Sequence, residues 1–107
     1  MKTFALGKSD LNVTRIGYGT MMIGGSWDDA PLTDTIRASA MKVVRTALDA
    51  GINFFDHADI YTKGKSEEVF ADIWKDAPSL RQKIYLQSKC GIRFALPLHR
   101  FDFSYEH

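Results

Sequence analysis

The sequence predicts an α/β fold, made of an amino-terminal β-hairpin, about three parallel strands and two helices. Two observations lead to this prediction. Short β-prone segments alternate with segments in which apolar residues recur at the helical period. In addition, a helix separates each core strand from the next, and strands connected in this way pair in parallel through right-handed crossovers.

The amino-terminal part of the chain predicts a hairpin followed by the first core strand. Residues 3–6 and 12–16 are β-prone, and the Gly-Lys-Ser-Asp sequence at 7–10 between them favours a turn. Residues 16–23 continue as an apolar segment, which we expect to be the first strand of the core. The Gly-, Asp- and Pro-containing residues 24–31 then predict a loop.

The next segment predicts a long helix that ends at Gly51. Thr33 or Asp34 is suited to the N-cap, because a short side-chain oxygen can accept a hydrogen bond from a free amide of the first turn. Glycine is a common residue just after the end of a helix. The apolar residues at helical spacing are Ile36, Ala40, Val43, Val44, Ala47 and Leu48.

A second strand, a second helix and a third strand follow. Residues 52–58 predict the strand, and Ser66 with two glutamates after it favours a helix start, because carboxylates stabilise the positive end of the helix dipole. The apolar stripe of this helix extends to Trp74, and Pro78 ends it. Residues 83–88 alternate in the manner of a strand.

The remaining residues, 91–107, predict a long loop, because Pro97, aromatic residues and mixed charges follow no regular period. Three parallel strands also leave backbone edges unpaired, so we expect residues 1–107 to form an incomplete domain of a larger fold. A flavodoxin-like sandwich is the alternative. The nucleotide-binding turn that would support it needs a glycine where Met22 stands.

Composition excludes several classes of function. Fourteen basic and thirteen acidic residues give a net charge of +1, so we expect no binding to nucleic acid or to an anionic membrane. Cys90 is the only cysteine, and the first residues lack the apolar stretch of a signal peptide, so a cytoplasmic location is expected. No histidine, cysteine and carboxylate cluster has the spacing of metal ligands, and we predict no metal site.

Three residues form a candidate catalytic group. Asp56 and Tyr61 come at and just after the end of the second strand, and Lys89 follows the third. Taken alone, each is ordinary: a packed aromatic, a surface cation and a turn carboxylate. Together they can do chemistry, since an ammonium beside a phenol stabilises the phenolate and lowers a pKa that starts at about 10. The sequence therefore predicts Tyr61 as a proton donor near neutral pH.

The same segments resemble the amino-terminal third of an aldo-keto reductase. The resemblance lies in residues 51–61, which contain Asp-His-Ala-Asp-Ile-Tyr, in Ser-Glu-Glu at 66–68 and in Ser-Lys-Cys-Gly at 88–91. Residues 17–21 are similar to the first barrel strand of that superfamily. The resemblance implies that the chain folds as the amino-terminal part of a (β/α)8 TIM barrel, with the active site at the carboxyl ends of the strands. It also implies an NADP(H) cofactor and a small carbonyl or alcohol substrate.

The family's roles are carried over where the residues match. Tyr61 would protonate the carbonyl oxygen while hydride passes from the nicotinamide to the carbonyl carbon. Lys89 would assist the phenol, and Asp56 would hold Lys89 and contribute to the cofactor site. Gly19, Thr20 and Met21, at the end of the first strand, would line the nicotinamide end of the cofactor.

Neither nearby histidine is expected to act as the acid. Strand alternation points His57 away from the face of Asp56, toward the helix layer. His99 comes too soon after Lys89 to lie on a fourth parallel strand, where the family has its catalytic histidine. That histidine and the later barrel units are therefore expected to be missing from this chain. An inactive remnant, or a cofactor-sensing regulatory subunit of the kind that modulates ion channels, remains the alternative.

Overall fold

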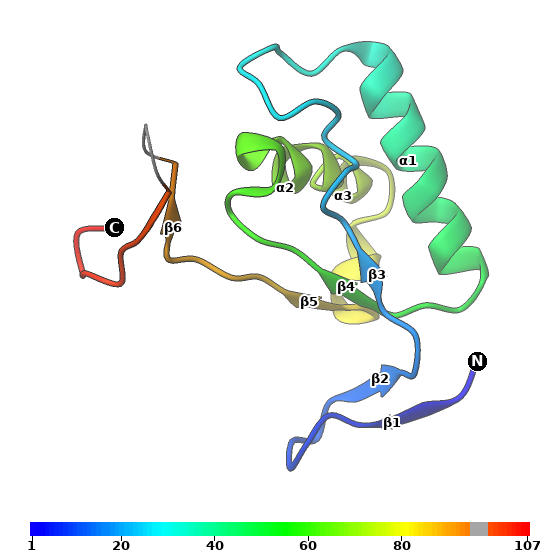
Figure 1. Ribbon diagram of the computed structural model, residues 1–107. Helices are drawn as coiled ribbons and strands as arrows, with labels where there is room; N and C mark the ends of the chain where they lie inside the picture. The colour runs from blue at the N-terminus through cyan, green and yellow to red at the C-terminus, as the bar shows by residue number, and fades with distance from the viewer. Residues whose placement is uncertain (95–98) are drawn as a thin grey trace.

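The computed structural model describes residues 1–94 and 99–107. Its central sheet consists of β3 (Tyr18–Gly19), β4 (Phe54–Asp56) and β5 (Tyr85–Gln87) in the order β3-β4-β5, and both strand pairs are parallel (Figure 1). The predicted parallel α/β arrangement is confirmed. β3 is shorter than the predicted strand because the chain turns immediately after it, where the Ile23 amide donates to the Thr20 carbonyl at 3.2 Å.

The predicted amino-terminal hairpin is also confirmed. β1 (Thr3–Ala5) and β2 (Asn12–Thr14) pair in antiparallel fashion. The hairpin lies below the central sheet in Figure 1, at the end where the strands begin. Asn53 fastens it there, because its side-chain oxygen accepts a hydrogen bond from the Thr14 amide at 2.8 Å and its amide donates to the Asn12 carbonyl at 3.0 Å.

Helix α1 (Asp34–Asp49) agrees closely with the prediction. Thr33 is the N-cap, and its side-chain oxygen accepts a hydrogen bond from the Ile36 amide at 3.2 Å. The chain leaves the helix through Gly51, whose φ of 84° lies in the left-handed region that glycine adopts without steric cost.

The predicted second helix is divided into two short ones. A 3-10 turn, η1 (Tyr61–Gly64), leads into α2 (Lys65–Phe70), and α3 (Ile73–Asp76) is followed by the 3-10 turn η2 (Pro78–Gln82). The division arises because backbone hydrogen bonds change to the shorter i to i+3 spacing between the two helices, for example from the Asp72 amide to the Val69 carbonyl at 3.2 Å.

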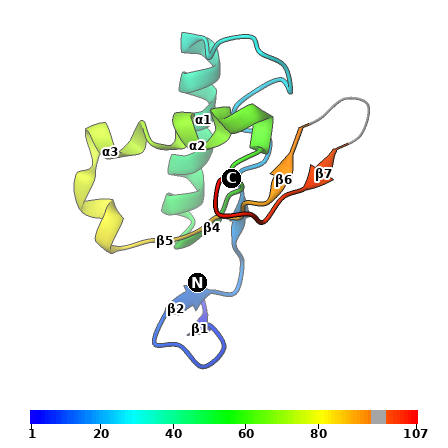
Figure 2. The ribbon, with the colours of Figure 1, turned by 90° about the vertical axis from the view of Figure 1, so that its left-hand side faces the viewer.

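The core lies between the central sheet and the helices. Phe55 of β4 is fully buried, and its ring centroid lies 5.3 Å from that of Phe70 on α2. Val44 of α1 and Ile73 of α3 belong to the same buried cluster. The helices therefore cover one face of the sheet, and the hairpin at the carboxyl end of the chain projects away from them (Figures 1 and 2).

His57 faces this helix layer, as the alternation of β4 predicts. Its side chain is 4% exposed, and its ring meets Phe70 edge-on at 4.6 Å between centroids. Its Nδ1 lies 2.9 Å from the Thr20 hydroxyl, which donates its own hydrogen to the Asp56 carbonyl. Because that hydroxyl hydrogen is already used, the hydrogen bond to Thr20 requires Nδ1 of His57 to be the donor. Burial lowers its pKa, and the charges of Glu67 and Asp56 offset only part of that effect.

The segment after β5 differs from the predicted loop over residues 91–107. β6 (Ile92–Arg93) and β7 (Arg100–Phe101) form a small antiparallel hairpin, and Arg93 lies 2.6 Å from the Asp102 carboxylate. Two-residue strands are too short for alternation to be visible in a sequence, which explains the difference. Pro97, on which the loop prediction partly depended, lies outside the described residues.

The arrangement is open compared with a compact domain of the same size. The radius of gyration is 15.1 Å, whereas a domain of this length has about 13 Å. The accessible surface is 7324 Å², compared with about 6,000 Å² for a compact monomer of this mass. Within the described residues, β3 and β5 each pair with β4 alone, so both outer edges of the sheet are free.

This openness predicts how residues 1–107 behave as an isolated polypeptide. We expect them to bind the dye ANS and to associate, because free strand edges and exposed apolar side chains such as Leu86 lack partners. Dye fluorescence and light scattering are the measurements. A monodisperse monomer that unfolds cooperatively and does not enhance the dye would contradict the expectation.

Burial of His57 predicts a pH dependence of stability. Because its folded pKa is lowered, the unfolded chain takes up the proton first, so stability is complete above about pH 6.5 and falls as the pH drops below that value. We expect His57→Gln to reduce the decline in the thermal midpoint of the native protein between pH 7.5 and pH 5.5. The control is the exposed His99→Gln. If the thermal midpoint falls with pH equally in His57→Gln and His99→Gln, His57 is not the cause of the pH dependence.

Candidate active site

The parallel register aligns three residues across the carboxyl ends of the central strands. Gly19 is paired with Asp56, and Asp56 with Gln87. Residues paired in this way share a face of the sheet, and Phe55, one position earlier, is buried under the helices. Gly19, Asp56 and Gln87 therefore lie on the opposite, open face.

Lys89 joins this row two residues beyond Gln87. Its ammonium lies 2.6 Å from Oδ1 of Asp56 and 2.6 Å from the carbonyl oxygen of His57. Gln87 donates to the same Asp56 oxygen at 2.7 Å. The ammonium is held between two acceptors on successive residues of one strand end, and its position is thus set by the backbone of β4 as well as by the ion pair.

The charge of Lys89 is stable in this environment. Partial desolvation lowers the pKa of Lys89, but the hydrogen bond to Asp56 and the proximity of Tyr61 outweigh this effect, so that the pKa is raised above its ordinary value. Lys89 remains a cation throughout the neutral range. A cation held in place can stabilise negative charge that develops on a neighbouring group.

Tyr61 completes the predicted group. It begins η1, and its amide donates to the Ala58 carbonyl at 3.1 Å. The Lys89 ammonium lies 5.1 Å from the centre of its ring. The structure thus brings together Asp56, Tyr61 and Lys89, the three residues that the sequence predicts as the catalytic group.

The strand-end residues Gly19, Thr20 and Met21 are placed differently from one another. A Cβ atom at Gly19 would meet no other atom within 4 Å, so the space beside it is open, and Met21 is 46% exposed. Thr20 is fully buried, and its hydroxyl and amide both donate to the Asp56 carbonyl. Its side chain therefore supports β4 from the core and does not line the open face.

The backbone is strained immediately after Tyr61. Thr62 and Lys63 have φ values of 48° and 58°, and Gly64 continues the turn with a φ of 88°. A β-branched residue in the left-handed region is a rare exception, and such strain costs on the order of 1–3 kcal/mol. No sequence pattern predicts Thr62 as part of the site. Gln87 was also not predicted, although alternation along the third strand places Gln87 and Lys89 on one face.

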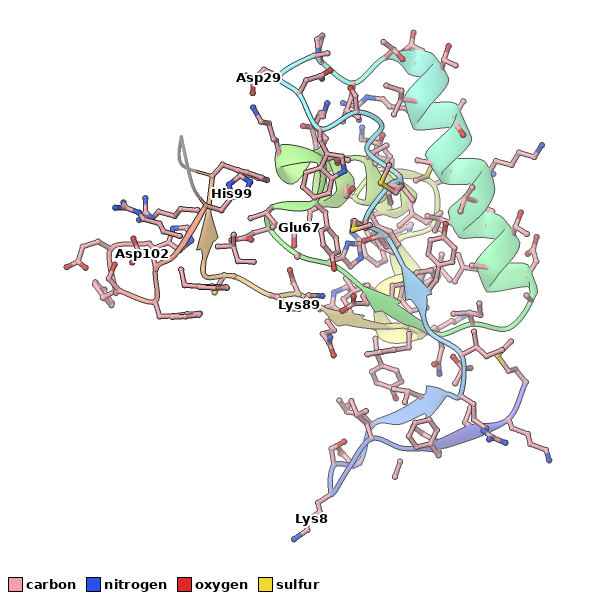
Figure 3. All side chains as sticks on the ribbon, in the orientation of Figure 1. Lys8, Asp29, Glu67, Lys89, His99 and Asp102 are labelled. Carbon is pink, nitrogen blue, oxygen red and sulfur yellow. The ribbon has the colours of Figure 1, made fainter. Side chains whose placement is uncertain are left out.

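Other polar residues lie apart from this group. Figure 3 shows His99 and Asp102 on the carboxyl-terminal hairpin, away from Lys89. The His99 ring packs edge-on against Phe94 at 4.9 Å between centroids. Among the residues described, no set of three or more histidine, cysteine or carboxylate side chains could hold a metal ion. No helix in that part of the chain is long and apolar enough to cross a membrane.

Comparison with known proteins places this arrangement in one family. Residues 15–107 match the model of the aldo/keto reductase family. An uncharacterized oxidoreductase of Bacillus subtilis is 32% identical over 94 residues, which cover 88% of this chain and 26% of that protein. The NADH-specific methylglyoxal reductase of Escherichia coli is 34% identical over 94 residues, covering 86% of this chain and 27% of that protein. The chain thus spans about a quarter of the length of these relatives.

Comparison with solved structures indicates the same family. An aldo-keto reductase from Bacillus halodurans in its holo form superposes with a TM-score of 0.70 at 32% identity, over 94% of this chain and 30% of that chain. These neighbours are (β/α)8 barrels, so the hairpin and the β3-β4-β5 units correspond to the amino-terminal part of such a barrel. The chain belongs to the aldo/keto reductase family.

Proposed function

We propose that this chain provides the amino-terminal part of the active site of an NADP-dependent aldo-keto reductase, which transfers hydride between NADPH and a small aldehyde or ketone. The observation that supports the proposal most strongly is the ion pair of Asp56 and Lys89 at the carboxyl ends of β4 and β5, with the ammonium 5.1 Å from the centre of the Tyr61 ring. A carboxylate, an ammonium and a phenol in this order suit the protonation of a carbonyl oxygen.

Each residue has a distinct role in the proposed reaction. Tyr61 donates its hydroxyl proton to the carbonyl oxygen, so that its O–H bond breaks as the alcohol O–H bond forms. Lys89 stabilises the phenolate that remains. Asp56 and Gln87 do not move a proton; they hold Lys89, Asp56 through the ion pair at 2.6 Å and Gln87 through the shared oxygen. The cofactor, when bound, supplies the hydride.

The open end of β3 fits a cofactor. Gly19 lies in register with Asp56, and the space beside it is free, so a planar ring could approach the backbone there. We assign Gly19 and Met21 to the wall of the nicotinamide site, with Thr20 supporting them from the core, and Asp56 to its floor. The choice of NADP(H) follows the family resemblance, and comparison with NADH is part of the test because the Escherichia coli relative is named NADH-specific.

A regulatory subunit is the second candidate. A protein of rice named as a probable voltage-gated potassium channel subunit beta is 30% identical over 84 residues, which cover 78% of this chain and 24% of that protein. A subunit that only senses the cofactor needs no proton donor. The ion pair of Lys89 with Asp56, together with the Tyr61 ring below the ammonium, favours the enzyme. The free cysteine Cys90 suits a reducing cytoplasm.

Tyr61→Phe tests the assigned acid. We expect kcat of the native gene product for carbonyl reduction to fall by about 10²-fold or more, because the ring remains but no proton can be donated. NADPH binding, followed by fluorescence, should be unchanged. Tyr105→Phe is the matched control, since Tyr105 is fully exposed. Turnover that survives in Tyr61→Phe would refute the acid, and wild-type protein that binds NADPH but reduces no carbonyl would favour the regulatory subunit.

Gly19→Val tests the cofactor wall. An added Cβ atom would meet no protein atom within 4 Å, so we expect normal folding but a dissociation constant for NADPH raised by about tenfold or more, because the branched side chain fills the space proposed for the ring. Titration with NADPH and with NADH measures the dissociation constants, and a thermal melt checks that the variant is folded. The control Ala38→Val makes a comparable addition on the exposed face of α1. Unchanged cofactor affinity in Gly19→Val would place the site elsewhere.

A further inference from the structure

A buried hydroxyl pair stands directly behind Tyr61. Thr62 and Ser66 are both fully buried, and their side-chain oxygens lie 2.9 Å apart. The Thr62 hydroxyl also lies 2.7 Å from the carbonyl oxygen of Tyr61. Because the Thr62 hydroxyl has one hydrogen, it can donate either to Ser66 or to the Tyr61 carbonyl; in the first case it joins Ser66 to the residue that directly follows the proposed acid.

The other member is attached to the loop after β3. The Ser66 hydroxyl donates to the carbonyl oxygen of Met21 at 3.2 Å and accepts a hydrogen bond from the Gly24 amide at 3.3 Å. Two segments that are far apart in the sequence, one at the proposed acid and one at the proposed cofactor wall, are therefore joined through two hydroxyl groups in the interior.

The fit of the two segments is close. A Cβ atom at Gly24 would lie 2.1 Å from the Thr62 hydroxyl and 2.7 Å from the Ser66 amide nitrogen, distances that no real Cβ atom could occupy. The loop after β3 approaches the turn so closely that only glycine fits at this point. The pair is thus enclosed by backbone, and a change in it has little room to be absorbed.

The left-handed turn requires support from outside itself. Threonine is disfavoured at a φ of 48°, and its neighbour Lys63 repeats the conformation at the surface. Strained conformations persist only where surrounding contacts over-determine them, and they concentrate at functional sites. The side-chain contact that holds Thr62 from outside the turn is the one to Ser66 on α2.

We propose that Thr62 and Ser66 are positioning residues, whose hydroxyl pair sets the proton donor Tyr61 at a fixed distance from the cofactor-side loop at Met21. This inference rests on the proposed function, because it takes Tyr61 as the acid and the end of β3 as the cofactor wall. Displacement of a reacting group by about 1 Å can cost about 10²-fold in rate, so a fixed link between the two walls has a direct consequence for turnover.

Three substitutions separate the hydroxyl from the turn. Thr62→Ser keeps the hydroxyl, Thr62→Gly keeps the left-handed turn but removes the hydroxyl, and Ser66→Ala breaks the link from the other side. Thr35→Ala, at an exposed position of α1, is the control. If the turn conformation alone were required, Thr62→Gly would behave as wild type, since glycine adopts a positive φ freely.

The first readout does not depend on activity. In the native gene product labelled with 3-fluorotyrosine, the ¹⁹F signal of Tyr61 is assigned by its loss in Tyr61→Phe. We expect this signal to shift or broaden in Thr62→Gly and in Ser66→Ala and to stay in place in Thr62→Ser. An unchanged Tyr61 signal in both hydroxyl deletions would overturn the proposal, whatever the protein catalyses.

The second readout is kinetic. We expect kcat per folded molecule to fall by about tenfold in Thr62→Gly, with KM for the carbonyl within about twofold of wild type and activity retained in Thr62→Ser. A hydroxyl pair that only stabilised the fold would lower the melting temperature without changing kcat, and that result would also overturn the proposal. If Thr62→Gly fails to fold, Ser66→Ala decides. A wild-type protein without reductase activity whose ¹⁹F signal still responds would refute the proposed function and leave the positioning role supported.

Discussion

The position of β4 between two parallel neighbours is the constraint from which the other features of the candidate site follow. Its hydrogen bonds to β3 and β5 align Gly19, Asp56 and Gln87 in one row at the carboxyl ends of the strands. Strand alternation then sends Phe55 and His57 into the helix layer. One short strand thus supplies the fully buried Phe55 of the core and the carboxylate of the site, on opposite faces.

The electrostatics of the site follow from that geometry. Lys89 reaches back across the strand ends to two oxygens at the end of β4, the Asp56 side-chain oxygen and the backbone carbonyl oxygen of His57, the residue after the strand. An exposed ion pair by itself contributes little to stability, so this contact is better understood as orientation than as stabilisation. The raised pKa of Lys89 keeps a positive charge beside the Tyr61 ring, where negative charge would develop in the proposed reaction.

The strained turn at Thr62 and the outer edges of the central sheet differ in how well they are supported. The turn after Tyr61 is held by contacts to the loop after β3, within the part of the structure that is well packed. The outer edges of β3 and β5 have no such support in the described residues, and the surface is larger than that of a compact domain. Order in the candidate site is therefore maintained by a few interior hydrogen bonds rather than by an enclosing fold.

The sequence alone determined the features that depend on local period and chemistry. Helix α1 with its cap Thr33 and the alternation that separates His57 from Asp56 could both be read from spacing and residue type, and Tyr61 and Lys89 could be named as candidates in the same way. Only the tertiary structure decided the contacts between distant segments. The Ser66 hydroxyl finds the Met21 carbonyl, and the residues at both ends of that hydrogen bond are ordinary in sequence. Such contacts, like the short β6–β7 hairpin, depend on how close two backbones come, a distance that no pattern in one segment encodes.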